Sequence, residues 1–168
     1  MRRANPLFFY LPLAALTLLS ALPSAAQSPA AAPRGAETQY LNPDGLTKPA
    51  GYTQVVVVAE PGKLIYISGQ TARNAAGEIV GKGDLRAQVT QAMENLRTAL
   101  IAAGATMQDI IKLNYYVVNL TQDQVPIIRA VREQYLTGRH PPAATLVGVT
   151  ALAQSDLMVE IEAVAARR

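Results

Sequence analysis

Residues His140–Arg168 read HPPAATLVGVTALAQSDLMVEIEAVAARR and contain two strand patterns separated by a polar turn. The first pattern covers residues 143–149, and the second covers residues 157–165. The second alternates, so its apolar odd-numbered residues point to one face of a strand while Glu160 and Glu162 point to the other. A pair of acids on a strand is often only a solvated face, so the neighbouring strands must decide whether these two carboxylates have a function.

The N-terminal residues have the layout of a secretory signal peptide. Arg2 and Arg3 precede an apolar run over residues 7–22, and small residues at 24–26 form a cleavage site. An uncleaved membrane anchor is the alternative, but the run is shorter than the roughly 20 residues that a membrane span needs. We therefore expect residues 1–26 to be removed as the protein is exported to the periplasm or secreted.

Residues 27–36 are rich in Ala and Pro and lack periodic apolar positions, which predicts a flexible linker. The folded domain then covers residues 37–168, a length that fits one core. Loss of Arg2 and Arg3 with the leader leaves basic and acidic residues nearly balanced, which argues against a nucleic-acid partner. The chain has no cysteine and one histidine, so a disulfide is excluded and a zinc site is not expected. After leader removal we expect no membrane contact.

The first half of the domain predicts two strands and a long helix. Residues 54–59 are dominated by valine, residues 63–69 form a second β-branched run, and a Pro-Gly turn joins them, so we expect a hairpin. Residues 84–103 place apolar side chains at three- and four-residue steps, which predicts a helix. Asp84 is suited to cap this helix and Gly104 to end it.

The second half predicts a strand over residues 110–118, a second helix, and the two C-terminal strands. The helix begins near Thr121 or Asp123 and ends before Gly138, and Pro126 favours the later start. The order β-β-α-β-α-β-β predicts an α+β fold with a single sheet. Each helix has one apolar stripe, so we expect both helices on one face of that sheet.

Two strand runs, residues 55–58 and 115–118, are apolar on both faces. The sheet face away from the helices therefore needs cover that the rest of the chain is too short to provide. Self-association of several copies in a closed ring supplies it, so we expect a homo-oligomer.

Six pieces of sequence, in order and at matching spacing, resemble the RidA/YjgF family of reactive-intermediate deaminases. The likeness covers the chain from about Tyr40 to its end, and its strength lies in the combination rather than in any one piece. In chain order the pieces are Gly51-Tyr52-Thr53-Gln54, Ile67-Ser68-Gly69-Gln70, Gly83-Asp84 with Gln88 and Glu94-Asn95-Leu96, Ala103-Gly104-Ala105 with Asp109-Ile110-Ile111-Lys112, Pro141-Pro142-Ala143, and Val159-Glu160-Ile161-Glu162-Ala163.

The resemblance implies a chorismate-mutase-like fold, a homotrimer, and small-molecule pockets in the clefts between subunits. It also implies hydrolysis of imines and enamines made from amino acids, giving a 2-oxo acid and ammonia without metal or organic cofactor. In the family, the arginine of a Pro-Ala-Arg motif holds the substrate carboxylate. This chain has Pro142-Ala143-Ala144 at that place.

The absent arginine predicts poor use of simple 2-imino acids, with Ala144 at the substrate-binding position. An arginine fork holds a carboxylate through two hydrogen bonds, and alanine offers none. Loss of such a partner weakens binding by about 2 to 5 kcal/mol, roughly 30- to 5,000-fold. Arg139 and Arg73 are candidates to replace the charge, although a solvated loop position is the ordinary interpretation for both.

The other family positions are kept in this chain. Glu162 matches a glutamate near the reacting carbon, where it would hold or activate water, and an interfacial ion pair is its alternative role. Ser68 and the Gly69 N–H match the polar wall of the pocket, or else serve the turn at the strand end. Tyr52 matches an aromatic that closes the pocket, or else packs at an interface. Glu160 is interpreted as structural.

Two functions from different classes remain. One is an exported enzyme that hydrolyses a labile C–N bond on a substrate lacking the usual carboxylate, which the retained Glu162 favours. The other is a non-catalytic trimer that binds small molecules or protects proteins, which Ala144 favours.

Overall fold

A computed structural model of the chain describes residues 38–138 and 140–167. The predicted signal peptide and linker lie outside this part of the chain, and so does Arg139. Within it, no helix has the length and apolar character needed to cross a membrane.

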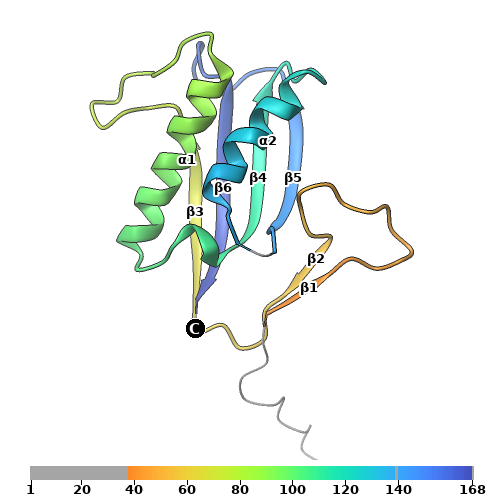
Figure 1. The fold of residues 1–168 in the computed structure, drawn as a ribbon. Helices are drawn as coiled ribbons and strands as arrows, with labels where there is room; N and C mark the ends of the chain where they lie inside the picture. The colour runs from red at the N-terminus through yellow and green to blue at the C-terminus, as the bar shows by residue number, and fades with distance from the viewer. Residues whose placement is uncertain (1–37, 139, 168) are drawn as a thin grey trace, which may run out of the picture. The chain divides into compact units, whose positions relative to one another are not determined.

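The described chain forms two helices, one short 3-10 turn and six strands (Figure 1). In chain order they are β1 (Gln39–Leu41), β2 (Val55–Val57), β3 (Lys63–Thr71), α1 (Leu85–Ala102), the 3-10 turn η1 (Met107–Asp109), β4 (Ile110–Val118), α2 (Gln124–Tyr135), β5 (Ala143–Val149) and β6 (Val159–Arg167). Both long helices and the last four strands lie where the sequence periodicity predicts them.

Four of the strands form one mixed sheet in the order β3-β6-β4-β5. β6 pairs antiparallel with β3 and β4, whereas β5 runs parallel to β4 because α2 carries the chain back across the sheet. Figure 1 shows α1 and α2 on the same face of this sheet. The fold is therefore α+β with both helices on one face, as predicted.

The predicted hairpin between the valine run and the next strand is wrong. β2 pairs with β1 in a separate two-stranded sheet, with Tyr40 opposite Val56, while β3 pairs with β6, so the prediction of a single sheet is wrong as well. Val55–Val57 has no alternation that buries one face, and two of its three residues are exposed. β6 offers β3 a longer partner whose alternate residues are buried under the helices, and this burial decides the pairing.

The core lies between the helices and the sheet. α1 packs on β3 and β6, and α2 packs against α1. The side chain of Asp84 accepts a hydrogen bond from the Ala87 N–H at the start of α1, and Gly104 follows its C-terminal residue with φ +72°, so both predicted ends are confirmed. Largest among the fully buried side chains are Met93, Leu96, Leu100, Leu113, Ile161 and Gln88.

The face of the sheet away from the helices is open in the single chain. Tyr66 on β3 is 76% exposed, and Leu64 and Val147 are also exposed on this face. Alternation along β6 and β4 places Glu162 here beside Asn114 of the neighbouring strand.

Tyr135 joins the two helices through its hydroxyl. The Tyr135 hydroxyl at the end of α2 donates to Glu94 Oε1 on α1 at 2.7 Å, and Arg97 also contacts Glu94. Burial and this bond raise the pKa of Tyr135 to about 12, and the same bond lowers the pKa of Glu94. The phenol is therefore the donor throughout the neutral range and the carboxylate the acceptor.

We expect Tyr135→Phe to lower the free energy of unfolding by about 1 to 2 kcal/mol at neutral pH, because a hydrogen bond to a carboxylate is lost. Since the folded-state pKa of Glu94 is below its ordinary value of 4.5, the stability from this contact is present above that pH and is lost as the pH falls through the folded-state pKa. Urea unfolding between pH 3 and 7 measures both effects. Tyr66→Phe, at an exposed tyrosine, is the control, and an equal loss at pH 3 and pH 7 would contradict the carboxylate's role.

Candidate active site

Four of the five predicted site residues, all except Gly69, line two cavities on opposite faces of the four-stranded sheet. Glu162 and Ser68 line one cavity on the open face. Tyr52 and Ala144 line another on the helix side. A single chain therefore brings these residues together in pairs and not as one group of four.

Glu162 sits in a small polar cluster on the open face. The Asn114 side-chain amide donates to Glu162 Oε1 at 2.6 Å, and the Tyr116 hydroxyl donates to the same oxygen at 2.9 Å. β4 supplies both donors, because Asn114 is directly opposite Glu162 in the antiparallel pair and Tyr116 is two residues further along. Among residues 38–138 and 140–167, no group donates to Glu162 Oε2, so one carboxylate oxygen is held by two donors and the other has none.

The charges around this cluster keep its donors protonated. The hydrogen bond to Glu162 raises the pKa of Tyr116, so the phenol remains a donor at neutral pH. Burial lowers the pKa of Lys112, and the nearby Glu162 carboxylate opposes that effect. Lys112 Nζ donates to Thr145 Oγ1 at 2.6 Å and lines the same cavity.

The cavity on the open face has a volume of about 280 Å³. Its polar lining comes from Tyr66, Ser68, Lys112, Asn114 and Glu162. Ser68 is exposed at the point where β3 departs from regular pairing, between Ile67 and Gln70. The arrangement can hold a water or a small polar ligand against the carboxylate of Glu162.

Gly69 has a packing role beside this cavity and does not line it. The carboxylate of Glu160 lies against the Gly69 backbone, and a Cβ placed there would come within 1.8 Å of Glu160 Oε1. Only glycine permits this approach, since nothing else lacks a Cβ. The interpretation of Glu160 as structural is consistent with this contact.

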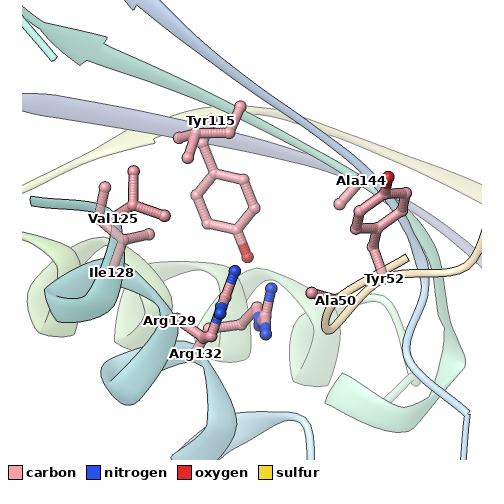
Figure 2. A pocket seen from close by; sticks show the side chains of 9 residues that line it. Ala50, Tyr52, Tyr115, Val125, Ile128, Arg129, Arg132 and Ala144 are labelled. Carbon is pink, nitrogen blue, oxygen red and sulfur yellow. The ribbon is translucent and has the colours of Figure 1, made fainter. Parts of the chain in front are cut away.

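The cavity on the helix side has a volume of about 300 Å³ and lies between α2, β4, β5 and the segment before β2 (Figure 2). Among the described residues, its polar lining is Tyr52, Tyr115, Arg129 and Arg132, with no acidic side chain. Its apolar lining consists of Ala50, Val125, Ile128, Ala144 and Leu146. Ala144 and Leu146 share a face of β5, as strand alternation requires.

Arg132 belongs to this cavity and was not predicted as a site residue. Its side chain is only 13% exposed, and a Cβ on Gly51 would approach its guanidinium to 2.4 Å, so the guanidinium lies directly on the Gly51 backbone. Gly51 has φ +82°, a conformation that also favours glycine. The sequence did offer one indication of this role, because Arg132 is a charged residue that follows Val131 on the apolar stripe of α2.

Arg73 was predicted as a possible substitute for the missing arginine, but its side chain forms hydrogen bonds away from both cavities. It donates to the Gly77 carbonyl and to Gln154 Oε1, and it lines neither of the two cavities above. His140 stacks on Tyr40 with ring centroids 4.7 Å apart. Within the part of the chain that the structure describes, no three His, Cys, Asp or Glu side chains gather as a metal site.

Comparison with known proteins places this arrangement in a family. The sequence model described as Endoribonuclease L-PSP matches residues 45–167. A solved structure from Yersinia pestis, described as a protein of unknown function of the conserved Rid protein family, is 38% identical with a TM-score of 0.70, covering 77% of this chain and 98% of that one. The chain belongs to the RidA/YjgF family.

Relatives within the RidA/YjgF family include proteins named as deaminases. A protein of Escherichia coli K12 named 2-iminobutanoate/2-iminopropanoate deaminase is 32% identical over 71% of this chain and 92% of its own length. A RutC family protein of Pyrococcus horikoshii is 35% identical over 70% of this chain and 89% of its own length. The crystal structure of Escherichia coli TdcF with bound serine is 28% identical, with a TM-score of 0.56 over 66% of this chain and 85% of that one.

We expect Gly69→Ala to lower the free energy of unfolding by about 1 to 3 kcal/mol, because the new methyl group would overlap the Glu160 side chain. The same substitution in a Glu160→Ala background should cost much less, since the overlapping atoms are gone. Chemical denaturation of the four proteins of this cycle measures the coupling. Equal costs in both backgrounds would show that the contact does not constrain position 69.

Proposed function

We propose that this RidA/YjgF family member hydrolyses a reactive imine or enamine, with Glu162 as the group that holds and activates water. The observation that supports the proposal is the asymmetric environment of its carboxylate. Two donors hold Oε1, at 2.6 and 2.9 Å, while Oε2 has no donor in the described part of the chain. A fixed carboxylate with one free oxygen is suited to general base catalysis.

The reaction needs one water and one proton carrier. Glu162 Oε2 accepts a proton from water as the water oxygen adds to the carbon of the C=N bond, and the nitrogen takes up that proton to give a carbinolamine. Glu162 then carries the hydroxyl proton to the nitrogen. The C–N bond breaks, a carbonyl product and ammonia leave, and the carboxylate is restored.

Asn114 and Tyr116 have positioning roles in this scheme. Their bonds to Oε1 hold the carboxylate in place, so that Oε2 can accept a proton without a loss of side-chain entropy at the moment of reaction. Ser68 on the same cavity wall offers a hydroxyl to the developing amine.

RNA cleavage, the activity implied by the name of the matching family model, fits this face less well. The open face carries the carboxylates of Glu160 and Glu162, which repel a phosphate backbone. The histidine of the chain stacks on Tyr40 and has no place in the Glu162 cluster.

We also propose that the protein is exported and acts as a homotrimer. One small ligand cannot contact both faces of a sheet in the same chain. A cleft that uses Glu162 and Ser68 together with Tyr52 and Ala144 therefore requires two copies, one for each half. The exposed apolar residues of the open face, led by Tyr66, support burial of that face between subunits.

We expect Glu162→Gln to slow hydrolysis roughly 10²- to 10⁴-fold, because the amide cannot accept the proton. Imines are generated in situ, from 2-aminobutanoate by an amino-acid oxidase and from a primary amine by an amine oxidase, and ammonia release is followed. Glu160→Gln, on the same strand face, is the matched control and should retain the wild-type rate. A Glu162→Gln rate equal to wild type would falsify the catalytic role, and a wild type inactive on both imines would favour the non-catalytic binding trimer.

The assembly proposal is tested by light scattering at micromolar concentration, where we expect a trimer mass. Tyr66→Asp places a charge on the open face and should lower the mass toward that of a monomer. Ile101 is also an exposed apolar residue, at 64%, but lies on α1 away from that face, so Ile101→Asp should leave the mass unchanged. A wild-type monomer, or an equal effect of both variants, would contradict association through the sheet.

A further inference from the structure

The helix-side cavity contains three polar groups that the hydrolysis scheme does not use. They are the guanidinium groups of Arg129 and Arg132 and the hydroxyl of Tyr115. Arg129 and Arg132 are three residues apart on α2, so both project from one side of the helix. Figure 2 shows the Tyr115 hydroxyl pointing toward these arginine side chains.

The positive charge in this cavity is poorly compensated. Among the described residues, the carboxylate oxygen within 4 Å of Arg132 is that of Glu133, at 3.6 Å, and the Glu133 side chain is 62% exposed. An arginine that is 13% exposed without a close partner carries a desolvation cost that an anion in the cavity would offset. No acidic residue lines the cavity to take that place.

Tyr115 gives an independent indication of a ligand. Its hydroxyl is buried, and it has no hydrogen-bond partner among residues 38–138 and 140–167. Burial raises the pKa of Tyr115, so the phenol is a donor at neutral pH. The neighbouring guanidinium groups have no acceptor to offer, and an unmade buried hydrogen bond is unfavourable. A ligand that carries acceptor oxygens would satisfy the hydroxyl and both arginines at once.

The remaining lining defines the rest of the ligand. Val125, Ile128 and Leu146 make much of the wall apolar, which suits an aliphatic chain and gives nothing to a fully polar anion such as phosphate. The volume of about 300 Å³ corresponds to roughly ten waters, enough for an acid of a few carbons. Ala144 lines the same cavity, so the helix arginines reach the space into which an arginine at position 144 would project.

We propose that Arg129, Arg132 and Tyr115 form a carboxylate site for a short-chain organic acid, with the charge supplied by α2 instead of by the strand motif. If the bound acid is the substrate, the accepted imines carry a carboxylate, contrary to the expectation drawn from Ala144. This part of the inference rests on the proposed hydrolysis. The binding site itself does not depend on catalysis.

Calorimetric titration of the purified protein tests the site with butanoate, its uncharged isostere butanamide, and inorganic phosphate. We expect saturable butanoate binding, at least tenfold weaker butanamide binding, and weaker binding of phosphate than of butanoate. Arg132→Met and Tyr115→Phe should each weaken butanoate binding at least tenfold, since each removes a donor to the carboxylate. Arg86→Met removes an exposed arginine of α1 and is the matched control, with unchanged affinity.

A second measurement separates ligand binding from folding. Without ligand, Tyr115→Phe should keep or raise the unfolding temperature, because it removes an unsatisfied buried hydroxyl; a purely structural tyrosine would show a decrease. Butanoate has no C=N bond to hydrolyse, so its binding is measured whether or not the hydrolysis proposal holds. The site is refuted by absent butanoate binding, by phosphate binding as tightly as butanoate, or by unchanged affinity in both Arg132→Met and Tyr115→Phe.

Discussion

The alternation of side chains along β6 and β4 is the constraint on which the site depends. Burial of Ile161 and Ala163 beneath α1 commits Glu162 to the open face. Because Tyr115 is buried under the helices, its neighbour Asn114 points to the open face. The antiparallel register then places Asn114 opposite Glu162. A slip of one residue would exchange the faces and remove both the core and the carboxylate cluster, so folding and site geometry are fixed by the same pattern.

Sequence periodicity predicted the elements whose burial is one-sided. Both helices, the α+β class and the acidic face of β6 follow from apolar spacing alone. The valine run could not be assigned in this way, because it does not alternate and its partner, β1, precedes it by a long loop. Arg132 and Tyr115 were missed for a related reason: each occupies a position that the pattern gives to the core, and only tertiary packing shows a charge and a hydroxyl converging there.

The two cavities differ in charge: the open-face cavity has one acid, Glu162, and one base, Lys112, whereas two arginines of α2 line the helix-side cavity. On the helix side, Ala144 leaves space that a longer side chain would fill, and arginines from α2 reach the same space from the opposite wall. The close approach of Arg132 to the Gly51 backbone holds its guanidinium in place without an ion pair of good geometry. The strand motif lacks its arginine, yet the cavity is positively charged. Arg129 and Arg132 of α2 supply that charge, so Ala144 alone does not determine which substrate charge the cavity accepts.

The separation of the two cavities has a consequence for activity. An acid held by Arg132 is on one face of the sheet, while the carboxylate that would activate water is on the other. If both act on one molecule, the carboxylate must come from a second copy of the chain, and each cleft is completed only on assembly. The catalytic rate per subunit would then depend on protein concentration, falling wherever dilution separates the copies even though each subunit stays folded. A monomeric variant with intact binding and no turnover would be the expected intermediate case, because the helix-side cavity is built within a single chain and the catalytic cleft is not.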